Sequence, residues 1–362
     1  MNAPVNPLQQ TKQLGQSIWL DNLSRTLIHE GGLKKLIAED GISGVTSNPA
    51  IFFNAISKSP YYHRDVERLK AANTPAEPLY ESLVIPDIQA ACDLMRDEYD
   101  RTQGRDGYVS LEVSPALAHD AAGTLAAGLR LKAAVQRKNL LIKVPATPAG
   151  LIAIEELIAQ GCSVNVTLMF SLAHVDGVAQ AYLRGLQRLI DSGGDPRVVK
   201  SVASLFLSRV DTLVDKQLDS LGGDALKLRG KAGVALAKLA YRAYQKTFQS
   251  DAFTKFATHG AMPQTMLWAS TGTKNPAYSD VLYVESLIGP QTINTVPDAT
   301  LAAFRDHGKA TATLETGMSD AEVHFNALAK AGIDMRQVGE TLQAEGVVLF
   351  EQAFDQLLKL LA

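Results

Sequence analysis

The feature that most constrains the fold is a repeated alternation of a short apolar run with a longer segment of helical periodicity. Eight runs are predicted as strands: Ser17–Asp21, Gly44–Asn48, Tyr108–Ser114, Asn139–Pro145, Ser163–Met169, Val202–Ser208, Thr265–Ser270 and Thr292–Val296. Strands that alternate with helices form βαβ units around a parallel sheet, and eight such units favour closure into a barrel. The sequence therefore predicts an α/β fold, a (β/α)8 TIM barrel.

Amphipathic spacing between the strands predicts the helices. The clearest segments are Asp120–Gln136, Ala149–Gln160, Leu172–Leu189 and Val210–Asp219. Gly161 follows the second of them, where a left-handed C-cap is expected.

The long interval between the second and third strands contains extra helices. At least two helical stretches are predicted there, around Tyr61–Lys70 and Pro86–Arg101, with Pro86 in the first turn of the second. No stretch has the composition of an interdomain linker, so residues 1–362 are predicted to form one domain. Its barrel spans about residues 15–300, and a helical C-terminal extension occupies about 300–362, with Gln337–Leu360 as its most continuous helix.

Composition excludes several classes of protein. The 35 basic and 38 acidic residues give a formal net charge of −3 without a basic stripe, so no nucleic-acid partner is expected. No apolar stretch approaches the ~20 residues that a membrane helix needs. Cys92 and Cys162 form no CxxC pair, and the polar N-terminus does not resemble a signal peptide. A cytoplasmic location is therefore expected.

Polar residues gather on one face of the predicted strands. Alternate residues of a barrel strand point inward or toward the helices, and the outward face here is mostly apolar. The inward face carries six polar residues on five consecutive strands: Asp21, Asn48, Glu112, Lys143, Asn165 and Thr167. Thr46 lies on the same face of its strand as Asn48. They lie mainly toward the carboxyl ends of the strands, where barrel active sites form. Burying so many polar groups without a function would be costly.

Lys143 suggests the chemistry of this set. It lies within the apolar run Leu140–Pro145, which belongs in a protein interior. Burial disfavours a charged amine, and only a neutral amine attacks a carbonyl. The protonated imine that results can accept the electrons of a neighbouring C–C bond as it breaks. Asp21 and Glu112 are candidates for the general base that such a reaction needs.

Each residue also has a structural interpretation. Lys143 could extend to water from a strand end, and Glu112 could be its ion-pair partner. Asp21 and Asn48 could cap the segments that follow them. Two residues could be buried polar groups with locally satisfied hydrogen bonds: Asn165 and Thr167.

Three motifs in order support the catalytic interpretation. Gly44–Phe52 contains Thr-Ser-Asn-Pro, Ile142–Thr147 is Ile-Lys-Val-Pro-Ala-Thr, and Asn165–Ser171 is Asn-Val-Thr-Leu-Met-Phe-Ser. They resemble the signatures of the transaldolases, members of the class I aldolase superfamily. The similarity of the strand pattern extends over about residues 15–300, and the long second-to-third-strand interval suits the longer-chain branch of that family.

The resemblance implies a role for each matched residue. Lys143 would form the Schiff base with the ketose carbonyl, and Asp21 would take the proton of the C4 hydroxyl. Glu112 and Thr167 would hold a catalytic water. Three residues would bind the dihydroxyacetone portion of the sugar: Thr46, Asn48 and Asn165.

The resemblance also implies a phosphate site on the sixth and seventh strands. Ser204 and Arg209 match a serine and an arginine that hold the sugar phosphate in the family. Ser270 begins a segment in which Lys274 stands where better-known members carry an arginine. Lysine is a point charge rather than a bidentate fork, so the geometry there differs. Arg209 could instead be a solvated residue at the start of a helix.

The expected activity is transfer of a dihydroxyacetone unit from sedoheptulose 7-phosphate to glyceraldehyde 3-phosphate, within the non-oxidative pentose phosphate pathway. No cofactor and no metal are expected, since the seven histidines show no HxxxH or HExxH spacing. The expected partners are sugar phosphates, and the expected state is a monomer or a homodimer. Three alternatives stay open: an aldolase similar to fructose-6-phosphate aldolase that releases free dihydroxyacetone, a metal-dependent barrel enzyme, and a non-catalytic sugar-phosphate binder.

Overall fold

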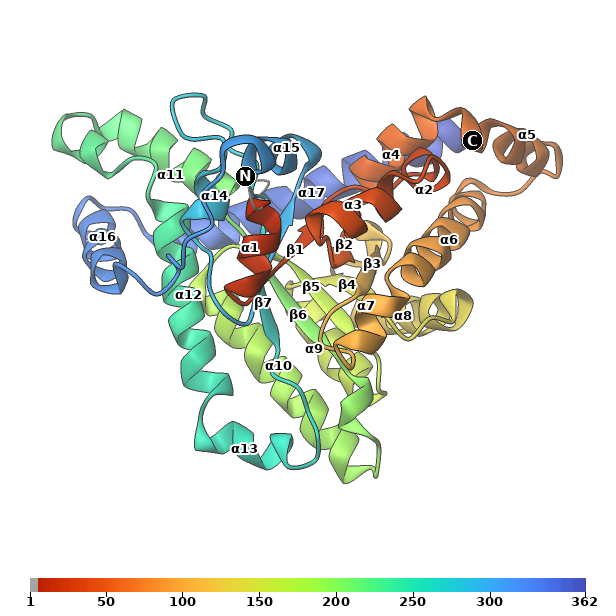
Figure 1. Cartoon of the computed structure of the whole chain (residues 1–362), viewed down its shortest axis with the longest axis horizontal. Helices are drawn as coiled ribbons and strands as arrows, with labels where there is room; N and C mark the ends of the chain where they lie inside the picture. Colours follow the sequence, from red (N-terminus) through yellow and green to blue (C-terminus); the bar gives the residue numbers. More distant parts are fainter. Residues whose placement is uncertain (1–5) are drawn as a thin grey trace, which may run out of the picture.

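A closed barrel of eight parallel strands forms the centre of the molecule (Figure 1). The computed structural model describes residues 6–362. Each strand pairs with the next in sequence, and β8 returns to pair with β1. The strands are β1 (Gln16–Leu20), β2 (Gly44–Val45), β3 (Tyr108–Glu112), β4 (Leu140–Pro145), β5 (Val164–Met169), β6 (Ser201–Phe206), β7 (Thr265–Ala269) and β8 (Thr292–Val296). The predicted (β/α)8 barrel is confirmed.

Several strands end earlier than predicted. The largest difference is at β2, which ends at Val45 rather than Asn48 because Asn48 already caps the following helix. The predicted sixth strand is also too long, since Ser208 is the first residue of a helix. The polar residues at the carboxyl ends of these strands lie beyond the last hydrogen-bonded strand pair, and their side chains can therefore face the mouth of the barrel.

Helices surround the barrel. Four match the predicted amphipathic segments: α8 (Ala121–Val135), α9 (Pro148–Ala159), α10 (Leu172–Asp191) and α11 (Ser208–Leu221). Gly161 has the expected left-handed backbone, with φ +66°. The other helices are α1 (Pro7–Gln13), α2 (Arg25–His29), α3 (Gly32–Asp40), α4 (Pro49–Lys58), α5 (His63–Ala71), α6 (Ala76–Leu94), α7 (Arg96–Arg101), α12 (Ala232–Phe248), α13 (Asp251–Ala257), α14 (Leu282–Glu285), α15 (Asp298–His307), α16 (Met318–Lys330) and α17 (Met335–Leu361).

The helices between β2 and β3 differ from the prediction, because the predicted stretch Pro86–Arg101 is divided between α6 and α7, and α4 was not predicted. The predicted start at Pro86 is wrong, because Pro86 lies inside α6, which begins at Ala76. Proline removes a backbone donor from the helix, so carbonyls of the preceding turn need other partners. The N–H missing at Pro86 would have bonded the carbonyl of Ser82, and the buried Arg25 guanidinium donates to the neighbouring carbonyl of Leu83 at 3.0 Å. A tertiary contact thus reaches the turn of α6 that precedes the proline.

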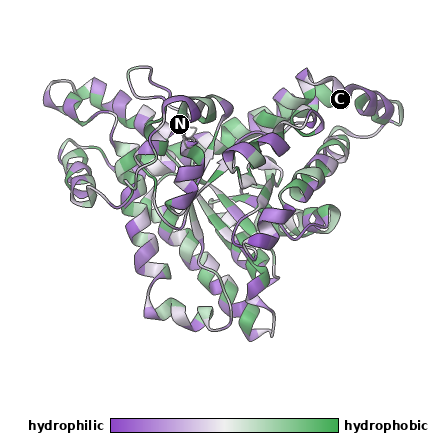
Figure 2. Cartoon of the chain, viewed as in Figure 1, coloured by the Kyte–Doolittle hydropathy of each residue, from purple (hydrophilic) through white to green (hydrophobic). Residues whose placement is uncertain are grey.

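Hydrophobic residues concentrate where strands and helices meet. Figure 2 shows the central strands as mainly hydrophobic, whereas the surrounding helices combine hydrophobic and hydrophilic residues. Outward strand residues such as Ile142, Val144 and Val166 are fully buried against the helices. The helix-facing side of the barrel therefore supplies the core and leaves the inward side available for polar groups.

The long C-terminal helix α17 packs across the barrel, and it corresponds to the predicted helix Gln337–Leu360 (Figure 1). Gln343 donates to the carbonyl of Ala146 at 3.0 Å and to that of Leu168 at 3.1 Å, which ties the helix to the ends of β4 and β5. Gly339 permits this close approach, since a Cβ there would lie 2.5 Å from the Cβ of Ser171. The C-terminal extension is therefore part of the barrel mouth.

No helix within residues 6–362 is both long enough and apolar enough to cross a membrane.

Candidate active site

A polar cavity of about 210 Å³ opens at the carboxyl ends of the strands. Larger hollows occur elsewhere, including one of about 660 Å³ at the opposite end of the barrel, so chemistry rather than size identifies the candidate. Eight of the eleven predicted site residues line it: Asp21, Thr46, Asn48, Lys143, Ser204, Arg209, Ser270 and Lys274. The other three, Glu112, Asn165 and Thr167, lie on the inward rows of β3 and β5 next to it.

Lys143 lies on the floor of this cavity. Its side chain is 6% exposed, and Nζ donates to the carbonyl of Ser47 at 3.0 Å. Strand register places Glu112 and Asn165 directly opposite it on the neighbouring strands. The distance from Nζ to Glu112 Oε2 is 3.6 Å. The alternative that Lys143 extends to water is wrong, because the amine is enclosed within the barrel.

Glu112 pairs with Lys143 but keeps unused hydrogen-bonding capacity. Burial raises the pKa of Glu112 to about 7, and the positive charge of Lys143 partly offsets that effect. Its Oε2 and the Oγ1 of Thr167 are both buried without a hydrogen-bond partner among residues 6–362. Buried polar atoms normally have partners, so these two oxygens are available to a small polar molecule. The ion-pair interpretation of Glu112 is therefore correct but incomplete.

Asp21 lies at the end of β1, where its backbone N–H donates to the carbonyl of Val296 at 2.8 Å. Thr46 Oγ1 donates to Asp21 Oδ1 at 2.7 Å and thereby orients the carboxylate. Desolvation raises the pKa of Asp21, and the charge of Lys143 opposes the rise. The capping alternative is wrong, because Ser24 caps the helix that follows. Asp21 is thus a desolvated carboxyl group that lines the same cavity as Lys143.

Asn48 caps a helix and lines the cavity at once. Its Oδ1 accepts from the backbone N–H of Ile51 at 3.0 Å, which fixes the start of α4. The interpretation of Asn48 as a helix cap is therefore confirmed, and its position at the cavity is compatible with the predicted binding role. The capping bond uses the carbonyl oxygen and leaves the amide group of the side chain as a donor.

Asn165 belongs to a buried hydrogen-bond network. It donates to Ser110 Oγ at 2.9 Å and accepts from Ser204 Oγ at 2.7 Å. The network supports the alternative that Asn165 is a buried polar residue whose hydrogen bonds are satisfied by its neighbours, and it fixes the orientation of the side-chain amide. Thr167 is held differently: the β5–β6 register shifts between Val166 and Met169, and Leu168 has φ +58°. Such an irregularity re-aims neighbouring side chains.

Two cations face the outer part of the cavity. Arg209 and Lys274 have no carboxylate within ion-pair distance among the described residues. Arg209 is half-buried in the first turn of α11, and its guanidinium lies 5.9 Å from the ring centroid of Phe206. Burial lowers the pKa of Arg209. Ser270 lies beside them and shares a 2.8 Å hydrogen bond with Ser208. The arrangement suits an anionic group, since fixed cations attract oxyanions.

Seven lining residues were not predicted from the sequence, and two of them lie against Lys143 or Thr46. Phe350 comes from α17, and its ring centroid lies 5.6 Å from Lys143 Nζ. No local pattern could have placed it there, because it is distant in sequence. Thr295, on β8, shares a 2.7 Å hydrogen bond with Thr46. The inward–outward alternation that selected the other residues would have found it.

No group of three or more His, Cys, Asp or Glu residues in the described part of the chain is arranged to hold a metal ion.

Comparison with known proteins finds similarity to one family over nearly the whole chain. Residues 18–361 match the family model described as transaldolase/fructose-6-phosphate aldolase. A transaldolase of Thiobacillus denitrificans is 54% identical, over 98% of this chain and 99% of its own length. Transaldolases of Mycolicibacterium smegmatis and Neisseria gonorrhoeae are 47% and 46% identical, with at least 93% of either chain covered.

Proposed function

Since the chain belongs to the transaldolase/fructose-6-phosphate aldolase family and acts as a Schiff-base-forming transaldolase, we propose that Lys143 is the lysine that forms the Schiff base. The observation that carries the proposal is the position of its buried amine, 3.6 Å from Glu112 in a cavity that Asp21 also lines. The donor is sedoheptulose 7-phosphate and the acceptor is glyceraldehyde 3-phosphate. The products are erythrose 4-phosphate and fructose 6-phosphate.

Imine formation is the first step. The neutral Nζ of Lys143 adds to the C2 carbonyl of the ketose, and the resulting carbinolamine loses water. Glu112 is a suitable proton relay, because a carboxyl with a pKa of about 7 both accepts and donates protons near neutrality. A water molecule bridging Glu112 Oε2 and Thr167 Oγ1 would use the two oxygens that have no protein partner in residues 6–362.

Bond cleavage follows. Asp21 accepts the proton of the C4 hydroxyl, the C3–C4 bond breaks, and its electron pair moves into the protonated imine. The aldehyde departs and an enamine remains on Lys143. The acceptor aldehyde then takes up the enamine carbon, and Asp21 returns the proton to the new hydroxyl. Hydrolysis of the second imine restores the lysine.

The two parts of the cavity bind different parts of the substrate. Near Lys143, the side chains of Thr46, Asn48 and Asn165 are suited to the hydroxyls of the dihydroxyacetone unit. At the outer part, Arg209 and Lys274 are suited to the phosphate, with Ser204 and Ser270 nearby. The phosphate thereby anchors the sugar with its carbonyl directed toward the amine.

The proposal is tested by two measurements on the same enzyme. Borohydride reduction with fructose 6-phosphate, followed by peptide mass spectrometry, should locate the reduced adduct on Lys143. Donor consumption should require an aldehyde acceptor. An adduct on Lys143 with full-speed consumption in the absence of acceptor would instead indicate an aldolase that releases dihydroxyacetone. Binding without any adduct would indicate a non-catalytic sugar-phosphate binder.

Replacement of Arg209 by alanine should raise the KM for phosphorylated donors about 10- to 100-fold, the usual scale for a charge-assisted hydrogen bond. Steady-state kinetics with sedoheptulose 7-phosphate measures this. Arg64→Ala, on the exposed side of α5, is the matched control and should leave KM unchanged. A loss confined to kcat would contradict a phosphate-binding role.

Replacement of Glu112 by glutamine should remove an ionisation near pH 7 from the pH–rate profile. Below that pH the carboxyl is protonated and cannot accept the proton that Lys143 must lose, so the wild-type rate should rise as pH passes through about 7. The variant lacks this titration, and its rate should be lower and flatter between pH 6 and 8. An unchanged rising limb in the variant would assign the ionisation to another group.

Three expectations complete the proposal. Activity should persist in excess EDTA, because no step uses a metal. The cytoplasmic location stays a prediction, as does the monomeric or homodimeric state.

A further inference from the structure

A second cavity, of about 660 Å³, lies at the amino-terminal end of the barrel. It is lined by the beginnings of β1, β7 and β8, by the segment before β3 and by Lys200, which precedes β6. This end of a barrel usually serves stability rather than catalysis. The charges that line the cavity give it a different character.

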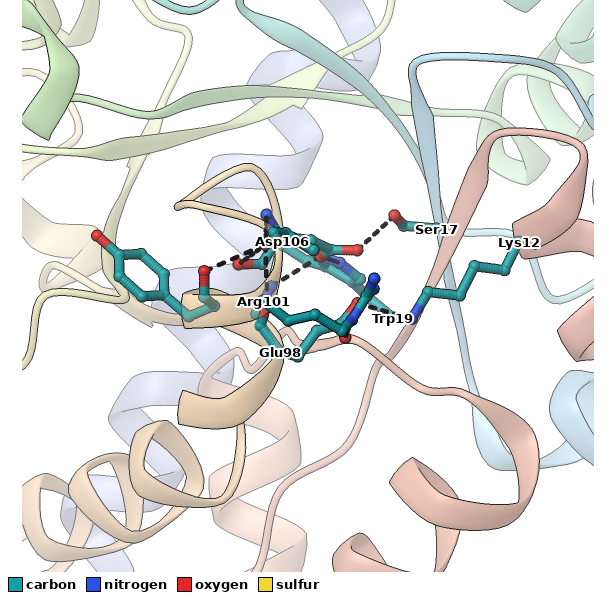
Figure 3. A network of polar contacts seen from close by, with 9 residues as sticks. Lys12, Ser17, Trp19, Glu98, Arg101 and Asp106 are labelled. Carbon is teal, nitrogen blue, oxygen red and sulfur yellow. Dashed lines mark hydrogen bonds and ion pairs between the residues drawn. The ribbon is translucent and has the colours of Figure 1, made fainter.

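Both carboxylates of the cavity are already engaged (Figure 3). Asp106 accepts hydrogen bonds from Ser17 Oγ at 2.5 Å, from Trp19 Nε1 at 2.8 Å and from the N–H of Gly107 at 2.9 Å. Glu98 accepts from Lys12 and from Arg101, at 2.6 and 2.8 Å. Four cations line the cavity, namely Lys12, Arg101, Arg105 and Lys200, together with the two carboxylates of Glu98 and Asp106. The lining therefore has two more positive than negative groups.

Lys200 is the least compensated of these cations. The residue is 4% exposed, and the hydroxyl of Thr265, at 2.7 Å, is the one hydrogen-bond acceptor of its Nζ among residues 6–362. An ammonium group has three donors, so two are unused. Arg105 lines the same cavity without a hydrogen bond or ion pair from its guanidinium in the described structure. Burial and the nearby charge of Arg105 lower the pKa of Lys200 to about 8, although Asp106 opposes the shift.

We propose that this cavity is a binding site for a small oxyanion, held by Lys200 and Arg105. A buried cation that forms no ion pair among residues 6–362 is costly, and an anion between the two side chains would compensate both charges. The guanidinium suits two parallel hydrogen bonds to a phosphate or carboxylate group, and the ammonium adds a point charge. The site is separate from Lys143 and does not depend on the function proposed above.

Isothermal titration at low ionic strength tests the site, with inorganic phosphate as one probe and malonate as the other. The background is Arg209→Ala combined with Lys274→Ala, which removes the cations of the other cavity. One saturable site per chain should remain there, and adding Arg105→Met or Lys200→Met should weaken it at least about tenfold. The preferred probe identifies the ligand as phosphate-bearing or as a carboxylate. Lys138→Met is the matched control, because Lys138 is an exposed lysine before β4 that does not line the cavity.

The pH dependence provides a second readout. Affinity should fall as pH rises through about 8, because Lys200 then loses its charge, and this fall should be absent in Lys200→Met. The lining also holds Tyr244, whose pKa burial raises to about 12, so it stays neutral in this range. Of the two carboxyl groups, burial raises the pKa of Asp106, whereas the hydrogen bonds from Arg101 and Lys12 lower that of Glu98 against the effect of burial. Absence of saturable binding in the double-alanine background would overturn the proposal. Equal affinity in Arg105→Met, a change at an exposed side chain without a hydrogen bond or ion pair in the described residues, would do the same.

Discussion

Replacement of Lys143 by alanine is expected to lower turnover by at least about 10⁴-fold, since the proposed reaction has no other nucleophile to begin it. The amine is buried, and its acceptor and its ion-pair partner both belong to the barrel mouth. Borohydride trapping with fructose 6-phosphate should disappear together with turnover. The protein should remain folded, because Glu112 can take up a proton once the neighbouring positive charge is gone. Circular dichroism and thermal unfolding check this.

Two further variants make the experiment specific. Lys143→Arg keeps the positive charge beside Glu112, but a guanidinium does not form an imine under these conditions, so it should be as inactive as alanine. Lys274 is another lysine that lines the cavity, so Lys274→Met is the matched control. It should retain the adduct and show a raised KM. Trapping that survives in Lys143→Ala and disappears in Lys274→Met would move the nucleophile to position 274.

The strands could be predicted because each carries its own local signal. Apolar runs such as Leu140–Pro145 lie between turns and amphipathic segments, and a one-residue change of register would turn every side chain to the other face. The same alternation selected the inward residues Lys143, Asn165 and Thr167. Boundaries were less accurate at β2, where Asn48 caps a helix and so ends the strand early.

Other features depend on contacts that no local pattern encodes. Pro86 lies inside α6, and Arg25, which is distant in sequence, supplies a donor to the adjoining turn. Phe350 reaches the candidate active-site cavity because α17 packs over β4 and β5 through Gln343. The cavity at the amino-terminal end was not predicted either. Lys200 precedes an ordinary strand, and only closure of the barrel brings it near Arg105.

Replacement of Asp21 by alanine is expected to slow carbon–carbon bond cleavage by about 10²–10⁴-fold, the usual scale for loss of a general base. Burial raises the pKa of Asp21 and so makes the carboxylate a stronger base, whereas the charge of Lys143 keeps it from being protonated too readily. Trapping of fructose 6-phosphate on Lys143 should persist, because imine formation does not need Asp21. Single-turnover kinetics of aldehyde release, measured beside the yield of reduced adduct, separates the two steps.

The controls for Asp21 use its neighbours. Asp21→Asn keeps the shape of the side chain and a hydrogen-bond acceptor for Thr46, so a defect equal to that of alanine would indicate lost basicity rather than lost packing. Thr46→Val removes the bond that orients the carboxylate and should give a smaller loss. Asp298→Asn should have a much smaller effect, since that carboxylate accepts from Asn22, does not line the cavity and acts on Asp21 only through its charge. Normal cleavage in Asp21→Asn would require that another base, with Glu112 the nearest candidate, remove the hydroxyl proton.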